Sequence, residues 1–254
     1  MVTHLPLLCT VAFAAGFVDA IVGGGGLIQT PASLVLLPQY PVATVIGTLK
    51  IPAFCGTGMA AIQYSRRVRL RWAQLAVMTT LAALSAAAGS KLLTVVSNQF
   101  MKPLLLIVLV AVAAYTWTNK KIGHHTEKNH SPRSQWARAL AISVVIGFYD
   151  GFIGPGAGTF LVLAFIGWLG FDFLKASAHA KFVNLSTNLG SILFFALSGK
   201  IIYAIALPMA VCNALGGALG ARMAILKGNA FIRILFLIVV CGTILRFAYD
   251  VFFR

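Results

Sequence analysis

The sequence predicts an all-α integral membrane protein built from two copies of one unit. Of its 254 residues, 59% are hydrophobic and only 10% are charged, and the mean hydropathy is +0.91. A soluble domain carries about 25% charged residues, so this chain lacks the polar side chains that a water-facing surface needs. Apolar runs near or above about 18 residues recur along it, and their continuity indicates helices rather than a β-barrel.

The second observation is an internal repetition. The stretch GFVDAIVGGGG, which begins at Gly16, returns as GFYDGFIGPGAG from Gly147, at an offset of 131 residues. The same offset aligns Lys50 with Lys181. Chance similarity between apolar segments does not align charged residues, and internal duplication is frequent in membrane carriers. We therefore predict a first membrane repeat over 1–118 and a second over 138–254.

Each predicted repeat contains four apolar segments. They span 5–38, 43–64, 72–95 and 101–118 in the first copy, and 138–170, 176–198, 202–224 and 230–252 in the second. The prediction is thus eight transmembrane segments, or ten if each opening segment crosses twice. A basic polar connector, residues 119–137, joins the copies, and we expect it in the cytoplasm. Its His124, His125 and His130 indicate a solvated loop more than a metal site, because no cysteine or acidic cluster accompanies them.

The opening segment of each repeat is too long for one straight crossing. About 33 helical residues would extend about 50 Å, against a hydrocarbon core of about 30 Å. The glycine clusters predict where each helix breaks, and Pro155 adds a steric block in the second copy. The second half-helix then begins inside the membrane, where its free N–H groups and positive dipole end favour an anion.

The breaks leave two topologies open. If each break reverses the chain, every copy has an odd number of crossings and the repeats are inverted; otherwise they are parallel. The arginine-rich loop at 66–71 and the connector should both be cytoplasmic. The inverted arrangement also places the basic loop at 222–233 inside and Lys200 outside, so we favour it, with both termini outside.

Two carboxylates lie one turn before the breaks. Asp19 and Asp150 are ionisable groups inside apolar segments, and such residues are functional by default. We predict that they carry a coupled proton. The alternative is a structural cap, or a partner for a lysine of the other copy.

Polar groups near the breaks are the candidate substrate ligands. Lys181, Asn184 and Asn188 share one helix face in the run HAKFVNLSTNLGS, and a cation with amide donors suits an oxyanion. A snorkelling lysine is the structural alternative. The candidate substrate-binding residues are Gly23, Gly24, Gly25, Gly26, Thr48, Lys50, Gly154, Gly156, Gly158, His179, Lys181, Asn184 and Asn188.

These stretches together resemble the TauE/SafE family of membrane permeases, in its YfcA-type branch. The resemblance rests on GFVDAIVGGGGLIQTP, IGTLK, GFYDGFIGPGAGTF, AHAKFVNLSTNLGS and GALGARMAILKGNAFIR, and it covers the chain except the connector. It implies a multi-pass transporter of the bacterial inner membrane, whose relatives include exporters of sulfite or organosulfonate anions. The family's glycine motif falls here on Gly23–Gly26 and Gly154–Gly158.

The favoured function is a secondary transporter of small anions, with export as the favoured direction. Sulfur oxyanions or organosulfonates such as sulfite are the expected substrates, and a proton gradient is the expected driving force, since no Walker motif is present. An intramembrane enzyme using aspartate and histidine, or an anion channel, is the alternative. We expect no cofactor, no metal and no nucleic-acid partner despite the net charge of +15, contact with the lipid bilayer, and homo-oligomers as an open option.

Overall fold

The computed structural model describes residues 4–253 apart from 98, 102, 105–106 and 108–130. Within these residues the regular structure is helical, without strands. The helices are α1 (Leu5–Val22), α2 (Gly25–Leu36), α3 (Val42–Ser65), α4 (Trp72–Val95), α6 (Pro132–Phe152), α7 (Ala157–Leu169), α8 (Phe173–Leu197) and α9 (Tyr203–Phe253).

Five of the described helices are long and apolar enough to cross a bilayer. They are Leu5–Val22, Val42–Ser65, Trp72–Val95, Phe173–Leu197 and Tyr203–Gly228, whereas α2 and α7 are shorter apolar helices. The all-helical membrane class is therefore confirmed, while the count of eight segments stays a prediction. The expected segment 101–118 and the connector histidines lie largely or wholly outside the described residues.

Helix α6 begins six residues before the apolar segment that was expected to start at residue 138. Ser131 is its N-cap and its hydroxyl accepts a hydrogen bond from the Ser134 backbone N–H at 3.4 Å. Proline at the first helical position has the backbone angle a helix needs and no N–H to leave unpaired. The polar letters SPRS therefore start a helix rather than continue the connector.

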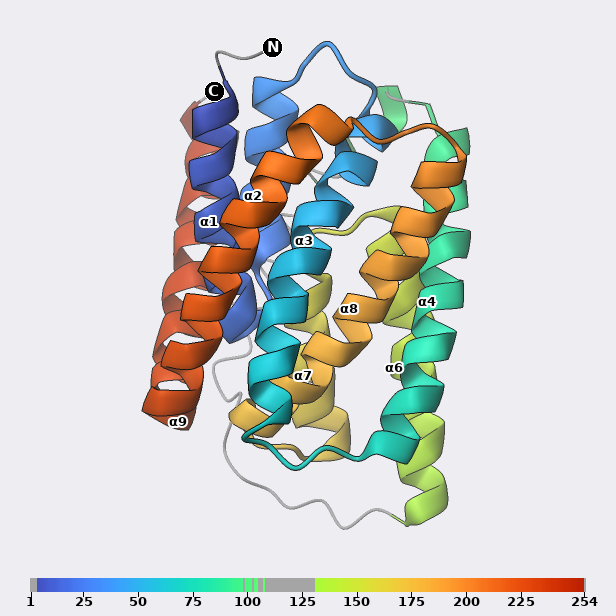
Figure 1. The fold of residues 1–254 in the computed structure, drawn as a ribbon, viewed down its shortest axis with the longest axis vertical. Helices are drawn as coiled ribbons and strands as arrows, with labels where there is room; N and C mark the ends of the chain where they lie inside the picture. The colour runs from blue at the N-terminus through green and yellow to red at the C-terminus, as the bar shows by residue number, and fades with distance from the viewer. Residues whose placement is uncertain (1–3, 98, 102, 105–106, 108–130, 254) are drawn as a thin grey trace.

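The opening segment of the chain folds into a hairpin of two helices. Helix α1 ends at Gly23, which has φ +81°, and α2 starts at Gly25. The position of a Cβ on Gly25 lies 2.6 Å from Ala15 O, so the first turn of α2 packs directly on α1. Leu37, after α2, shares an apolar cluster with Leu8 at the start of α1. The second half-helix thus returns toward the end where the first began (Figure 1).

The second broken segment repeats this arrangement from the opposite end of the molecule. Gly154 and Gly156, with φ +90° and +85°, separate α6 from α7. Only glycine adopts such angles without strain. Arg138, near the start of α6, donates from Nη1 to the Trp168 carbonyl, near the end of α7, at 2.9 Å. In Figure 1, α6 enters from the lower end, and α7 returns to it.

The long helices run between the two ends. From the upper end of Figure 1, which holds both chain termini, α3 and the first part of α9 descend, while α4 and α8 ascend. Helix α9 contains a non-helical residue, Gly228, with φ +69° and ψ −161°, after which the chain turns back. The structure therefore gives the direction of the chain, from one end of the molecule to the other, at both breaks and in four long helices.

Small residues allow the helices to approach closely, as is usual in membranes. A Cβ on Gly147 would lie 2.8 Å from Ala82 O, so α6 packs on α4 backbone to backbone. At the corresponding place in the other half, a Cβ on Gly16 would lie 2.2 Å from Asn213 O, where α1 packs on α9. These contacts hold the two broken segments in fixed positions.

Candidate functional site

The two breaks meet in the middle of the molecule. A Cβ on Gly23 would lie 2.3 Å from the carbonyl carbon of Gly158, and a Cβ on Gly158 would lie 2.5 Å from Gly23 O. A Cβ on Gly26 would lie 3.2 Å from the Cα of Pro155. The glycines therefore serve two purposes, since they interrupt the helices and let the interruptions touch.

A buried ion pair joins the first repeat to the second break. Lys50, on α3, donates from Nζ to Asp150 Oδ1 at 2.9 Å and to the Asp150 carbonyl at 2.7 Å. Lys50 is 5% exposed and Asp150 is 4% exposed. The other carboxylate oxygen of Asp150 accepts a hydrogen bond from Thr187, on α8. Asp150 therefore links α3, α6 and α8.

A second ion pair joins the second repeat to the first break. Lys181, on α8, contacts Asp19 Oδ2 at 3.0 Å and also donates to the Asp19 carbonyl. Thr57, on α3, donates to the same carboxylate oxygen at 3.1 Å. Each lysine thus contacts the aspartate of the other repeat, and the offset of 131 residues relates the two pairs to each other.

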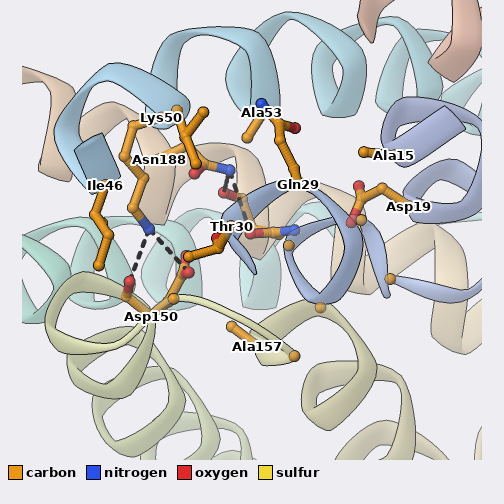
Figure 2. Close-up of a pocket in the computed structure, with 18 of the residues that line it drawn as sticks. Ala15, Asp19, Gln29, Thr30, Ile46, Lys50, Ala53, Asp150, Ala157 and Asn188 are labelled. Atoms are coloured by element: carbon orange, nitrogen blue, oxygen red, sulfur yellow. Dashed lines mark hydrogen bonds and ion pairs between the residues drawn. The ribbon is translucent and has the colours of Figure 1, made fainter. Parts of the chain in front are cut away.

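A small cavity of about 60 Å³ lies between the breaks. Figure 2 shows Asp19 and Asp150 on opposite sides of it, with Lys50 reaching toward Asp150. The first residues of both returning half-helices line it, namely Gly25 and Gly26 of α2 and Ala157 and Gly158 of α7. Ligand pockets for organic molecules occupy about 300 Å³ or more, so this cavity fits a small ion or a few water molecules.

The walls of the cavity combine paired charges with neutral donors. Within the part of the chain that the structure describes, its two carboxylates each contact a lysine. Positive potential also comes from the N-terminal ends of the dipoles of α2 and α7. The Ala157 N–H itself donates to the Gly154 carbonyl at 3.2 Å. Amide side chains from three helices complete the lining: Gln29, Asn184, Asn188 and Asn213.

Most of the expected site residues line this cavity. Those that do are Asp19, Gly23, Gly25, Gly26, Lys50, Asp150, Gly154, Gly156, Gly158, Asn184 and Asn188. Lys181 lies just behind the lining, fully buried against Asp19. Gly24 is the N-cap of α2 and does not line the cavity.

Two expected ligands lie elsewhere. The Thr48 hydroxyl donates to Thr44 O at 2.7 Å and accepts from the Ile202 backbone N–H at 3.0 Å, so it joins α3 to the start of α9. His179 lies nearly two turns after the start of α8, with its ring centroid 4.8 Å from that of Phe171. Thr48 precedes Lys50 by two residues, and His179 precedes Lys181 by two. Two residues correspond to about 200° around a helix, so each side chain lies on the opposite face from its lysine.

Three polar residues of the cavity were not expected from the sequence. Gln29 and Thr30 follow the first turn of α2. Asn213 lies in the first part of α9, before Gly228, and its Nδ2 donates to Gln29 Oε1 at 2.9 Å. Gln29 and Thr30 are an adjacent polar pair in an apolar helix, and Asn213 is a single amide among apolar neighbours. The two amides could have been found from the sequence. An amide inside a membrane helix is costly unless it has a hydrogen-bond partner, so its presence there indicates a buried partner.

A family comparison decides what kind of protein this is. The profile described as "Sulfite exporter TauE/SafE" matches residues 8–247, which include both breaks and both ion pairs. The chain belongs to the TauE/SafE family. It is accordingly a membrane protein of a permease family, and the resemblance found in the motifs is confirmed.

Curated relatives of this TauE/SafE chain bear similar names. A probable membrane transporter protein, ORF9, of Sinorhizobium sp. is 35% identical over 97% of this chain and 93% of its own. Probable membrane transporter proteins of Haemophilus influenzae and of Escherichia coli K12, the latter named YfcA, are each 34% identical over 97% of this chain, covering 95% and 90% of their own. No solved structure matches the chain significantly.

Proposed function

We propose that this chain is a secondary transporter of small oxyanions, with sulfite and related sulfur oxyanions as its substrates, in a bacterial inner membrane. The family description names sulfite export, and the relatives are named as transporters. The observation that carries the proposal is the cavity into which the N-termini of two half-helices open from opposite repeats. Such ends favour anions, and carriers commonly bind substrate between discontinuous helices near the membrane midplane.

The proposed topology is a pair of inverted repeats. Its support is that α1–α2 enters from one end and α6–α7 from the other, and that contacts recur at the offset of 131 residues. Gly220 packs on Phe17 as Gly89 packs on Phe148, in addition to the two ion pairs. In this arrangement each repeat supplies one break, one lysine and one aspartate to the same cavity.

Charge supports an orientation in which the lower end of Figure 1 faces the cytoplasm. Basic side chains gather in loops and helix ends there, whereas Lys91 and Lys200 lie at the upper end. Short cytoplasmic loops are enriched in lysine and arginine. The basic residues at the lower end are Arg66, Arg67, Arg69, Arg71, Arg133, Arg138, Lys175, Arg222 and Lys227.

The ion pairs suggest how a proton couples to the anion. As long as Asp150 is ionised, it neutralises Lys50, and the positive charge of the cavity is limited to helix ends and amides. Protonation of Asp150 removes its negative charge, so that the Lys50 ammonium becomes available to an oxyanion. Proton and anion then bind together, and the direction of net transport follows the sum of their gradients. Asp19 and Lys181 have the same geometry and form a second, more enclosed pair.

The enzyme alternative finds less support. It required Asp19, Asp150 and His179 to act as one acid–base group, and proton transfer needs hydrogen-bond contact or a single bridging water. His179 instead contacts Phe171 and the Lys175 carbonyl at the start of α8, whereas both carboxylates line the cavity.

The proposal is tested by transport in proteoliposomes that contain the purified protein. A panel of radiolabelled sulfite, sulfate, thiosulfate, taurine and acetate is offered, with protein-free liposomes as the background. We expect saturable sulfite uptake that unlabelled sulfite competes away. Replacement of Lys50 by Met should reduce this uptake at least tenfold, and Lys200→Met should leave it unchanged. Uptake of no anion in the panel, or equal uptake by Lys50→Met and the wild type, would contradict the proposal.

A further inference from the structure

Three buried side-chain atoms lack hydrogen-bond partners among the residues that the structure describes. They are Gln29 Nε2, Ser33 Oγ and Ser191 Oγ. Their residues are 3%, 0% and 0% exposed. Most buried polar groups in proteins have a hydrogen-bond partner, so each exception calls for an explanation such as contact with a water molecule or a ligand. An interaction with water or an ion in another conformation would supply the missing partner.

These atoms lie on one side of the cavity. Gln29 is part of its wall, and Ser33 follows one turn further along α2, in the direction of the upper end. On α8, Asn188 lines the cavity and Ser191 follows about one turn later, again toward the upper end. Polar groups therefore continue from the cavity along both helices in the same direction.

The equivalent positions on the other side are apolar. At the offset of 131 residues, Gln29 corresponds to Phe160 and Ser33 to Ala164 on α7, while Ser191 corresponds to Ala60 on α3. Those residues lie between the cavity and the lower end. The polar lining is thus a property of the upper half of the molecule and is not produced by the repetition itself.

In this conformation the polar line is closed. Leu34 of α2 packs against the apolar cluster that contains Val42, Ile46 and Phe195, and Phe195 of α8 is 0% exposed. A path between α2 and α8 would open if these apolar side chains separated. Serine and amide groups would then contact water or the passing ion, which removes the cost of leaving them unpaired.

We infer that the outward leg of the substrate's path runs between α2 and α8, lined by Gln29, Ser33 and Ser191 and closed by Leu34 and Phe195. Gln29 is the first donor on this path, because its Oε1 is held by Asn213 and its Nε2 remains free for an oxyanion oxygen. This inference depends on the proposed transport function, and on the upper end facing outward.

Cysteine accessibility tests the path. Single cysteines are introduced as Ser33→Cys and Ser191→Cys after the native Cys9, Cys55, Cys212 and Cys241 are replaced by serine. Intact cells are treated with a membrane-impermeant, negatively charged methanethiosulfonate, with and without sulfite. The matched controls are Ala164→Cys and Ala60→Cys, the repeat-related positions. Labelling of denatured samples with a maleimide verifies that each thiol is present and each protein is expressed.

We expect both serine-derived cysteines to react from outside at least tenfold faster than the two controls, and sulfite to slow that reaction. Reaction at Ser33→Cys and Ser191→Cys no faster than at the controls overturns the inference. If the two positions react faster but sulfite neither slows the reaction nor is transported, the path stands and the proposed substrate fails. If sulfite is transported but neither position reacts, the function stands and the path fails.

Discussion

Asp19 and Asp150 each contact a lysine that lies far away in the sequence. The sequence correctly marked all four residues as unusual, since an ionisable group in an apolar segment is costly. Which aspartate meets which lysine depends on how the repeats interlock, and no periodicity within a helix reports this. One alternative from the sequence was that each aspartate pairs with a lysine of the other copy. Both ion pairs have this arrangement.

The Lys50–Asp150 pair is expected to be energetically coupled. Lys50→Met leaves a buried carboxylate without its partner, which costs about 3–5 kcal/mol. Removal of both charges in Lys50→Met/Asp150→Leu should restore most of the stability, because no uncompensated charge remains. Thermal unfolding in detergent measures this, with Lys200→Met as the control. A double variant as unstable as Lys50→Met would show that the two residues do not interact.

Gln29 is expected to contribute one hydrogen bond to the bound anion. A hydrogen bond to a charged group is worth about 1.5–3 kcal/mol, which corresponds to about ten- to hundredfold in affinity. Gln29→Glu keeps the acceptor of Asn213 Nδ2 and removes the Nε2 donor, so the dissociation constant of the variant for sulfite should rise by at least that factor in calorimetry. Gln29→Met removes both groups and should weaken binding as well. Gln63→Met is the matched control, since Gln63 donates to Ala218 O outside the cavity. Equal affinities of Gln29→Met and wild type would exclude this role.

At the scale of elements, the glycine clusters and the excess length of the opening segments predicted two broken helices. Both breaks are present, at Gly23–Gly24 and Gly154–Gly156. The contact between the two breaks was not predictable. A glycine in a sequence can indicate either a special backbone angle or a close approach of another backbone, and the sequence does not distinguish the two. Gly158 illustrates the second case, since it lies inside α7 and accommodates Gly23.

Contact between the breaks predicts that Gly158 tolerates no side chain. A Cβ there would lie 2.5 Å from Gly23 O, and overpacking of this kind costs about 1–3 kcal/mol or more. Gly158→Ala should therefore lower the unfolding temperature and abolish sulfite transport. Gly167→Ala, on the same helix, is the control, since a Cβ at Gly167 meets no atom within 4 Å. Wild-type transport by Gly158→Ala would show that close contact between the two breaks is not required for transport.

At the scale of the whole molecule, hydropathy was sufficient to predict a membrane protein. The orientation of the molecule in the membrane is predicted from the distribution of basic residues instead. The inverted arrangement places Lys200 outside and Lys227 in the cytoplasm. In a background without native cysteines, Lys200→Cys should react with an impermeant maleimide added to intact cells, and Lys227→Cys should react only after the membrane is opened. The reverse pattern would contradict the inverted arrangement, because parallel repeats exchange the sides of these two loops. External reaction at both positions would contradict a single crossing between them.

The central claim is that protonation of a carboxylate at a break frees a lysine for the anion. Asp150→Asn imitates the protonated state permanently and keeps the shape of the side chain. Proteoliposomes with this variant are tested for sulfite exchange without a gradient and for accumulation driven by an imposed pH gradient. The account predicts that exchange persists at a rate within about threefold of the wild type, while the response to the pH gradient disappears. Full accumulation driven by the pH gradient in Asp150→Asn, and also in Asp19→Asn, would contradict it.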